Sequence, residues 1–291
     1  MSELVKRTLS GAVFVGCIIG SILWNQWAIA GLILLVSLLA VDEFHRLVHS
    51  YIIPRICAAL GTIVIWCMFV CIAYHPGNND GGNGFALAFG AVYLPIIVLS
   101  LLDEIWNHSG NTVQNWGNML ISQFMIAFPL LSMLFMYSLD KWLLLALFVL
   151  IWVNDTAAYC VGSFTAKRPQ GNHKMTPHIS PKKSWEGLFG GFAFSILTAF
   201  ILNWFGWFDA IASGEGHANG WMVLLIGFFT SGFGTMGDLM ESLFKRTIGV
   251  KDSGFFLPGH GGVLDRFDSI LLAAPIMTAF CWICYFIAPL L

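Results

Sequence analysis

The sequence predicts an all-α, polytopic integral membrane protein with about nine transmembrane helices, and three observations support this fold class. Of its 291 residues, 57% are apolar and only 10% are charged, a balance far from that of a soluble domain. Apolar runs of roughly 20 residues recur along the whole length, each long enough to cross a hydrocarbon core of about 30 Å as a helix. Lys and Arg gather at one set of span ends. A single membrane domain over residues 1–291 is therefore expected.

Each predicted span is an apolar run bounded by polar or turn residues. The first two runs are the shortest, and they form either two crossing helices or a re-entrant pair; removing both leaves every later orientation unchanged. The loop at residues 77–84 is rich in Gly and Asn and is expected to be a flexible connector. The predicted spans cover roughly residues 9–24, 27–41, 56–75, 84–102, 118–138, 142–162, 187–207, 220–240 and 268–290.

Positive charge orients these spans. With the N-terminus inside, every Lys and Arg except Lys141 lies on the cytoplasmic side or at its boundary. An odd number of spans then places the C-terminus outside. The expected partner of such a chain is the lipid bilayer, with no nucleic acid.

The character of the chain changes near residue 154. Residues 1–153 carry few charges inside their predicted spans and are expected to serve mainly as scaffold. Residues 154–291 contain Asp155, a basic loop at 167–183 and a segment at 238–268 rich in ionisable groups. Such groups are costly at a membrane unless they pair, face water or bind a cation. A catalytic, cytoplasm-facing site is therefore expected in this second half.

The strongest local motif begins inside the eighth predicted span and leaves it at the cytoplasmic side. Asp238, Glu241 and Ser242 share one face of a helix there. Glu241 either binds a cation or pairs with Lys245, in an order of charges that stabilises a helix by a few tenths of a kcal/mol. Asp238 has no such local partner. Gly237, with its neighbouring glycines, permits either close helix packing or close approach of a phosphate.

A second ionisable cluster precedes the last predicted span. Two of its acids, Asp265 and Asp268, share a helical face. Mg²⁺ prefers carboxylate oxygens and usually takes one or two of them together with substrate phosphates and water. Asp238 with Asp265 is therefore the first-choice metal pair, and Asp268 and Glu241 are further candidate ligands. The cluster comprises Lys251, Asp252, His260, Gly261, Gly262, Asp265, Arg266 and Asp268.

The glycine run of this cluster is either an anion-binding turn with exposed backbone N–H groups or a flexible loop.

A third motif follows the basic loop. Ser180 and Pro181 have the residue types of an N-cap and a first helical position, so a helix is expected to start there. Lys182 and Lys183 would then oppose the helix dipole, which favours phosphate binding over a solvated face. Asp155 is expected to line the same cavity.

Together these motifs resemble the signature of the phosphatidate cytidylyltransferase family, also called CDP-diacylglycerol synthase. The resemblance implies transfer of CMP from CTP to phosphatidic acid, giving CDP-diacylglycerol and pyrophosphate, with Mg²⁺ as cofactor and room for a second cation. It also implies a homodimer in the plasma (inner) membrane of a bacterium. The matching segments are 242–246, 251–252 and 260–268, with further similarity at 154–156 and 180–183.

The implied reaction is in-line attack by a lipid phosphate oxygen on the α-phosphorus of CTP, with metal on Asp238 and Asp265 neutralising the leaving pyrophosphate. Asp252 and Asp268 either orient the binding cations or ligate a second ion. His260 is a candidate proton carrier, although a lipid phosphate with a second pKa of about 6 to 7 needs no strong base near pH 7. Substrate contacts are expected from Asp155, Ser180, Lys182, Lys183, Ser242, Lys245, Arg246, Lys251, Gly261, Gly262 and Arg266.

Two alternatives stay open. A related enzyme would use CTP with another lipid phosphate. An ion-coupled transporter would also carry intramembrane carboxylates and glycine-broken helices, but its acids should lie at mid-bilayer. Here the acids cluster at one face.

Overall fold

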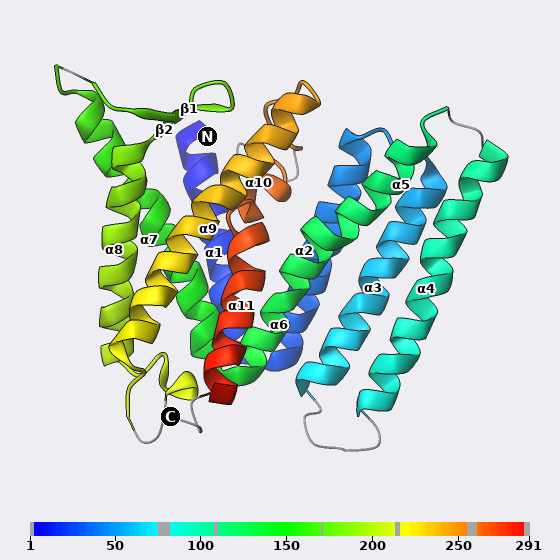
Figure 1. Cartoon of the computed structure of the whole chain (residues 1–291), viewed down its shortest axis with the longest axis horizontal. Helices are drawn as coiled ribbons and strands as arrows, with labels where there is room; N and C mark the ends of the chain where they lie inside the picture. Colours follow the sequence, from blue (N-terminus) through cyan, green and yellow to red (C-terminus); the bar gives the residue numbers. More distant parts are fainter. Residues whose placement is uncertain are drawn as a thin grey trace. The chain divides into compact units, whose positions relative to one another are not determined.

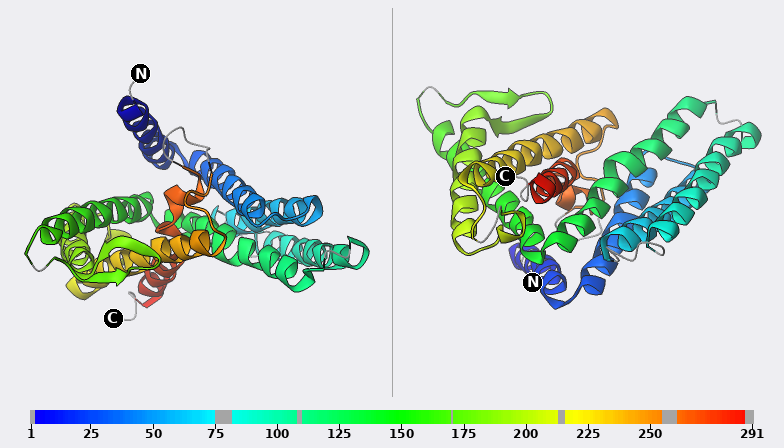
Figure 2. Two further views of the ribbon diagram at one scale, coloured as in Figure 1. Left: turned by 90° about the horizontal axis from the view of Figure 1, so that it is seen from above. Right: turned by 60° about the horizontal axis from the view of Figure 1, so that its bottom comes forward.

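A computed structural model describes residues 3–74, 82–107, 110–169, 171–212, 216–254 and 261–287. These residues form helices almost throughout, together with one two-stranded antiparallel sheet (Figures 1 and 2). The predicted all-α class is therefore confirmed. The chain divides into two compact units. Unit 1 comprises Met1–Ser138 and Asp252–Arg266, and unit 2 comprises Leu139–Lys251 and Phe267–Leu291.

Unit 1 consists of apolar helices, of which α2 packs against both α1 and α3, and α3 packs against α4. Asn25 separates α1 from α2, because its Oδ1 accepts hydrogen bonds from the backbone N–H groups of Trp27 and Ala28 as an N-cap. A π-helical turn at Ser122–Ala127 joins α5 to α6. The helices that lie wholly or largely in this unit are α1 (Glu3–Trp24), α2 (Gln26–Leu47), α3 (Ile52–Tyr74), α4 (Gly82–Asn107), α5 (Thr112–Ile121), α6 (Phe128–Leu139) and α10 (Leu264–Phe267).

Unit 2 is a bundle in which α8 packs between α7 and α9, and α11 packs on α9. Glycine permits close approach of these helices: a Cβ on Gly227 of α9 would lie 2.6 Å from the Cα of Ile196 on α8. A 3₁₀ turn at Asp209–Ile211 lies between α8 and α9. The other elements are α7 (Lys141–Ala166), β1 (Lys174–Thr176), β2 (Ser180–Ser184), α8 (Trp185–Trp204), α9 (Gly220–Thr247) and α11 (Ile270–Ile287).

The helices match the predicted spans segment by segment. Within the described ranges, seven helices are long and apolar enough to cross a bilayer, and two shorter apolar helices lie at Ser10–Trp24 and Ile270–Phe286. The segment Thr112–Leu139 acts as one span because α5, the π-helical turn and α6 are continuous. The expected count of about nine is thus approximate, and the inside position of the N-terminus stays a prediction.

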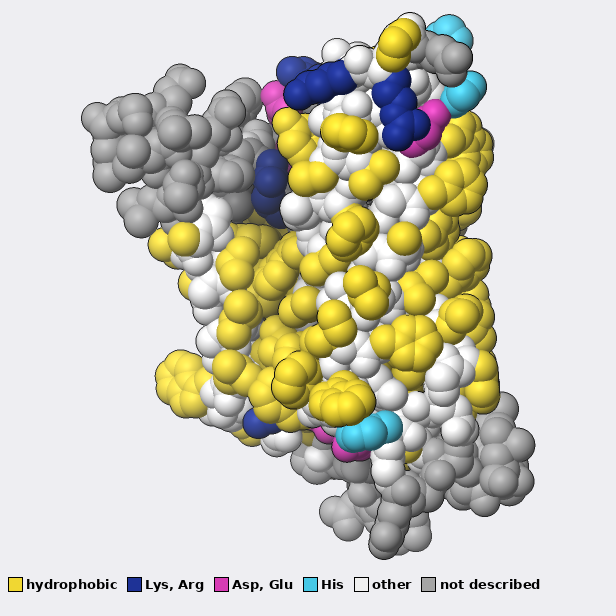
Figure 3. Space-filling view, turned by 90° about the vertical axis from the view of Figure 1, so that its left-hand side faces the viewer, with side chains coloured by type: hydrophobic (Ala, Val, Ile, Leu, Met, Phe, Trp, Pro, Cys, Tyr) yellow, Lys and Arg dark blue, Asp and Glu magenta, His cyan; other side chains and the backbone are white. Residues whose placement is uncertain are grey.

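The surface of unit 2 has the character of a lipid-facing protein. Figure 3 shows a broad band of hydrophobic side chains on one face, with Lys and Arg gathered toward the top of the view. The exposed apolar side chains of α8 include Phe189, Phe194, Leu197, Phe200 and Trp204. A contiguous apolar surface of this extent would be costly in water and is expected of helices that face lipid tails. The chain is therefore an integral membrane protein.

The predicted helix start at Ser180 is wrong. Residues Ser180–Ser184 form β2, which pairs with β1 so that Lys174 lies opposite Ser184. Helix α8 begins at Trp185, and Ser184 is its N-cap, with Oγ accepting the backbone N–H of Gly187 at 3.2 Å. Ser184 is buried, and its Oγ would lie 3.2 Å from a Cβ on Gly162 of α7. Packing against α7 therefore selects the later of the two serines as the cap.

Candidate functional site

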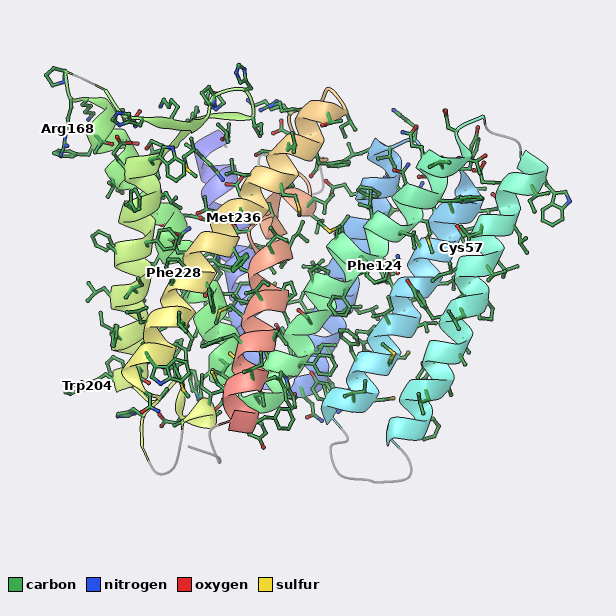
Figure 4. All side chains as sticks on the ribbon, in the orientation of Figure 1. Cys57, Phe124, Arg168, Trp204, Phe228 and Met236 are labelled. Atoms are coloured by element: carbon green, nitrogen blue, oxygen red, sulfur yellow. The ribbon has the colours of Figure 1, made fainter. Side chains whose placement is uncertain are left out.

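A charged pocket in unit 2 is lined by polar residues from three elements. Its volume is about 360 Å³, within the range of small-molecule sites. In Figure 4, Arg168 at the end of α7 and Trp204 at the end of α8 lie at opposite ends of unit 2, and the β1–β2 hairpin lies at the Arg168 end. The polar residues that line the pocket are Asn154, Asp155 and Tyr159 of α7, Ser180, Lys182, Lys183 and Ser184 of β2, and Thr235 and Asp238 of α9. Five predicted site residues, Asp155, Ser180, Lys182, Lys183 and Asp238, are thus brought together.

Asp238 has a partner from another element, which local sequence could not reveal. The Nζ atom of Lys183 lies 2.7 Å from Oδ2 of Asp238, and the same Nζ donates to the Thr235 carbonyl at 3.3 Å. Ser242, one turn further along α9, donates its hydroxyl to Oδ1 of Asp238 at 3.3 Å. Lys183 is therefore fixed against α9, whereas Lys182 is exposed.

The orientation of Asp155 is set by its buried neighbour Asn154. Ser231 of α9 donates to Oδ1 of Asn154 at 2.5 Å, and Nδ2 of Asn154 donates to Oδ1 of Asp155 at 3.2 Å. A Cβ on Gly191 of α8 would collide with Oδ1 of Asn154, so that position admits only glycine without a shift. The Asp155 carboxylate is thus oriented toward the pocket by residues of three helices, α7, α8 and α9.

Asp268 lies beside α9, just before α11 begins. A Cβ on Gly237 would lie 2.5 Å from the carbonyl oxygen of Asp268, so close backbone packing accounts for this glycine. The Asp268 carboxylate accepts the backbone N–H of Ser269 at 2.6 Å. The negative charge of Asp238 lies close enough to act on this carboxylate. The acidic charge here is thus only partly compensated.

The acids of unit 2 suit a divalent cation that arrives with phosphate. Asp155, Asp238 and Asp268 interact electrostatically with one another and with Lys183. Among the described residues, no three His, Cys, Asp or Glu side chains converge closely enough to hold a metal by themselves. Mg²⁺ usually takes one or two protein carboxylates and completes its shell with phosphate and water. The donor set therefore fits Mg²⁺, which stays a prediction.

The last turn of α9 carries the basic residues of the strongest motif. Glu241 is buried and pairs with Lys245 at 2.6 Å, which is the ion-pair alternative that the sequence left open. Arg246 is exposed and donates to the carbonyls of Ile179 and Val250, each at 3.4 Å. Its contact with Ile179 ties the hairpin to the end of α9. Cations at this position also complement the helix dipole.

Asp265 lies in unit 1, within a tight turn. Its Oδ2 accepts the backbone N–H groups of Ser253 at 2.9 Å and Gly262 at 2.8 Å. Gly261 has φ +84°, a conformation that favours glycine. Glu43 of α2 accepts the N–H of Val263 at 2.7 Å. Sequence reasoning missed Glu43, because it lies outside the predicted spans, in the half expected to be scaffold.

Asp238 and Asp265 belong to different units, so the predicted metal pair stays a prediction. Lys251, Asp252 and Arg266 are exposed. His260 lies outside the described residues. The division into a scaffold half and a catalytic half also stays a prediction, although Glu43 places one residue of the first half beside Asp265.

Apolar spanning helices around a pocket of acids and lysines define an integral membrane protein with a site at one end of its helices. A family model described as the cytidylyltransferase family matches residues 5–284, and the chain therefore belongs to this family. Relatives named phosphatidate cytidylyltransferase are 46% identical over 130 residues in Staphylococcus epidermidis (strain RP62A) and 44% over 130 residues in Staphylococcus haemolyticus. One from Haemophilus influenzae is 42% identical over 138 residues. These matches span 45–47% of this chain and 45% of each relative, so the chain aligns with less than half the length of these relatives.

Proposed function

We propose that this protein is a phosphatidate cytidylyltransferase, which transfers CMP from CTP to phosphatidic acid and releases CDP-diacylglycerol and pyrophosphate. The observation that carries the proposal is the pocket in which Asp155, Lys183 and Asp238 meet at one end of the apolar helices. Membership of the cytidylyltransferase family and the name of the relatives support it. One substrate is a two-chain lipid and the other a soluble polyanion, so a site at the membrane surface admits both.

The residues of the chain bind and orient the reacting phosphates. Lys182, exposed beside the pocket, attracts the triphosphate as a mobile point charge. Lys183, held by Asp238, presents a fixed cation. An oxygen of the lipid phosphate forms a bond to the α-phosphorus of CTP while the bond from that phosphorus to the β-phosphate bridging oxygen breaks. Pyrophosphate leaves with the electron pair.

No base is required for this attack, because the lipid phosphate is already largely dianionic near pH 7. Asp238 and Asp265 would hold Mg²⁺, with Asp268 as a further candidate ligand, and the ion would neutralise the charge that grows on pyrophosphate. Lys245, Arg246, Lys251 and Arg266 would contribute further positive charge along the path of the triphosphate.

The proposal includes a cellular setting. The distribution of Lys and Arg supports an N-terminus inside and a pocket facing the cytoplasm. The bacterial relatives support the plasma (inner) membrane of a bacterium. A homodimer rests on the family resemblance alone.

Pyrophosphate release by the purified full-length protein tests the proposal. Release should require phosphatidic acid, CTP and Mg²⁺ together, should stop with a chelator, and should not occur with dATP in place of CTP. Asp265→Asn should lower kcat/KM by more than about 100-fold, because a metal ligand is lost. Absence of release with every lipid phosphate tried, combined with ion flux in proteoliposomes, would establish the transporter alternative instead.

A further inference from the structure

A carboxylate from the first half of the chain supports the turn that carries Asp265. Glu43 lies in the last turns of α2, within unit 1. Its Oε2 accepts the backbone N–H of Val263 at 2.7 Å. The same carboxylate also lies close enough to Ser253 and to the backbone of Leu264 to interact with both electrostatically. Glu43 thus lies against both backbone segments that surround Asp265, namely residues 253–254 and 262–264.

Two glycines of these segments leave space for this carboxylate. A Cβ on Gly254 would lie 2.8 Å from Oε1 of Glu43. A Cβ on Gly262 would overlap Oε1 of Glu43 and the hydroxyl of Ser253. The Glu43 carboxylate therefore fills the space that a side chain at position 254 or at position 262 would need. This double complementarity is not expected of an acid that merely reaches solvent.

The same two segments also hold Asp265. The backbone N–H groups of Ser253 and Gly262 both donate to Oδ2 of Asp265. Glu43 and Asp265 therefore contact the same two backbone segments. If Gly262 moved into the space that Glu43 occupies, its N–H group would move away from Asp265. The two carboxylates are therefore linked through the backbone of these segments.

The adjacent acid on α2 behaves differently. Asp42 pairs with Arg46 at 2.8 Å and with Arg55, and its side chain is 29% exposed. A partly exposed ion pair of this kind contributes little to stability. The Oε1 atom of Glu43, in contrast, is buried. Burying a carboxylate costs free energy, so a buried carboxylate is expected to have a specific role. Asp42 is therefore a natural control for Glu43.

We propose that Glu43 is a positioning residue, which fixes the turn of residues 261–264 so that Asp265 is held in the orientation that nucleotidyl transfer requires. The assignment of a catalytic role to Asp265 rests on the proposed function; the support of the turn by Glu43 does not. The first half of the chain then supplies part of the site's framework in addition to lipid-facing surface.

Hydrogen exchange and steady-state kinetics on the full-length protein test the proposal together. In Glu43→Ala, amide exchange of peptides covering Ser253 and residues 261–266 should accelerate by at least about 10-fold, while peptides from α9 keep their protection. The value of kcat/KM for CTP should fall by about 10- to 100-fold, as for other outer-shell residues of metal sites. Glu43→Gln, which keeps one acceptor oxygen for Val263, should give smaller changes in both quantities.

Asp42→Asn is the matched control and should leave exchange at Ser253 and residues 261–266 unchanged. Unchanged exchange there in both Glu43 variants would overturn the proposal, as would a uniform rise across all peptides of Glu43→Gln, which would indicate a general structural role. If the unmodified protein releases no pyrophosphate, the proposed function fails, and the exchange data still decide whether Glu43 holds the turn.

Discussion

At the scale of single residues, two adjacent lysines of β2 have different environments. Lys183 is held by Asp238 and the Thr235 carbonyl, whereas Lys182 is exposed. The sequence predicted both lysines in the first turn of a helix, where both would have had the same role in binding phosphate.

Separate substitution of the two lysines should therefore give unequal effects. Lys183→Met should lower kcat/KM for CTP by about 10- to 100-fold, because it leaves Asp238 without its cation and removes a fixed charge from the pocket. Lys182→Met should mainly raise KM for CTP, by less than about 10-fold, since an exposed point charge is screened by water and salt. Steady-state kinetics measure both changes. A larger loss in Lys182→Met than in Lys183→Met would contradict the pocket geometry.

At the scale of elements, glycine determines how closely the helices of unit 2 approach. Gly227 meets the backbone of Ile196, Gly190 meets the side chain of Val161, and Gly237 meets the backbone of Asp268. These contacts hold α7, α8 and α9 together around the pocket and place Asp268, just before α11, against α9. Small residues serve this purpose in membrane bundles because lipid tails provide no hydrophobic force between helices.

Gly227→Ala should therefore destabilise unit 2. The added Cβ would lie 2.6 Å from the Ile196 Cα, so the helices must separate, at a cost of about 1–3 kcal/mol. Gly31→Ala on α2 is the control, because nothing lies within 4 Å of its added Cβ; this change should be neutral or stabilising by about 0.5–1 kcal/mol. Thermal unfolding in detergent compares them. Equal unfolding temperatures for the two variants would show that this contact is not tight in the protein.

At the scale of the whole molecule, the arrangement of charge predicts its orientation. The hairpin, with Lys174 and Lys182, should face the cytoplasm, and the segment near Lys141 should face outside. The site would then be supplied with nucleotide from the side where CTP is present.

Cysteine labelling in intact cells tests this orientation, in a background from which the seven native cysteines have been removed. A cysteine at His217, which is exposed between α8 and α9, should react with a membrane-impermeant maleimide without permeabilisation. A cysteine at His178, exposed in the hairpin turn, should react only after permeabilisation. The opposite pattern would invert the topology and exclude a cytoplasmic pocket.

The sequence alone determined the fold class, the positions of the apolar segments and most of the candidate residues. Apolar run length is a local property that bilayer thickness sets directly, so each span could be located without knowledge of its neighbours. The motif residues Asp155 and Asp238 were likewise evident, because ionisable groups are rare in such segments.

Only the tertiary structure decided which residues meet. It paired Lys183 with Asp238, chose Ser184 over Ser180 as the cap of α8, and brought Glu43 to Val263, 220 positions away in the chain. The Lys183–Asp238 and Glu43–Val263 contacts follow no helical or strand period, so no pattern within one segment encodes them. They depend on packing between segments distant in the sequence, where glycine positions and buried hydrogen-bond partners select one arrangement.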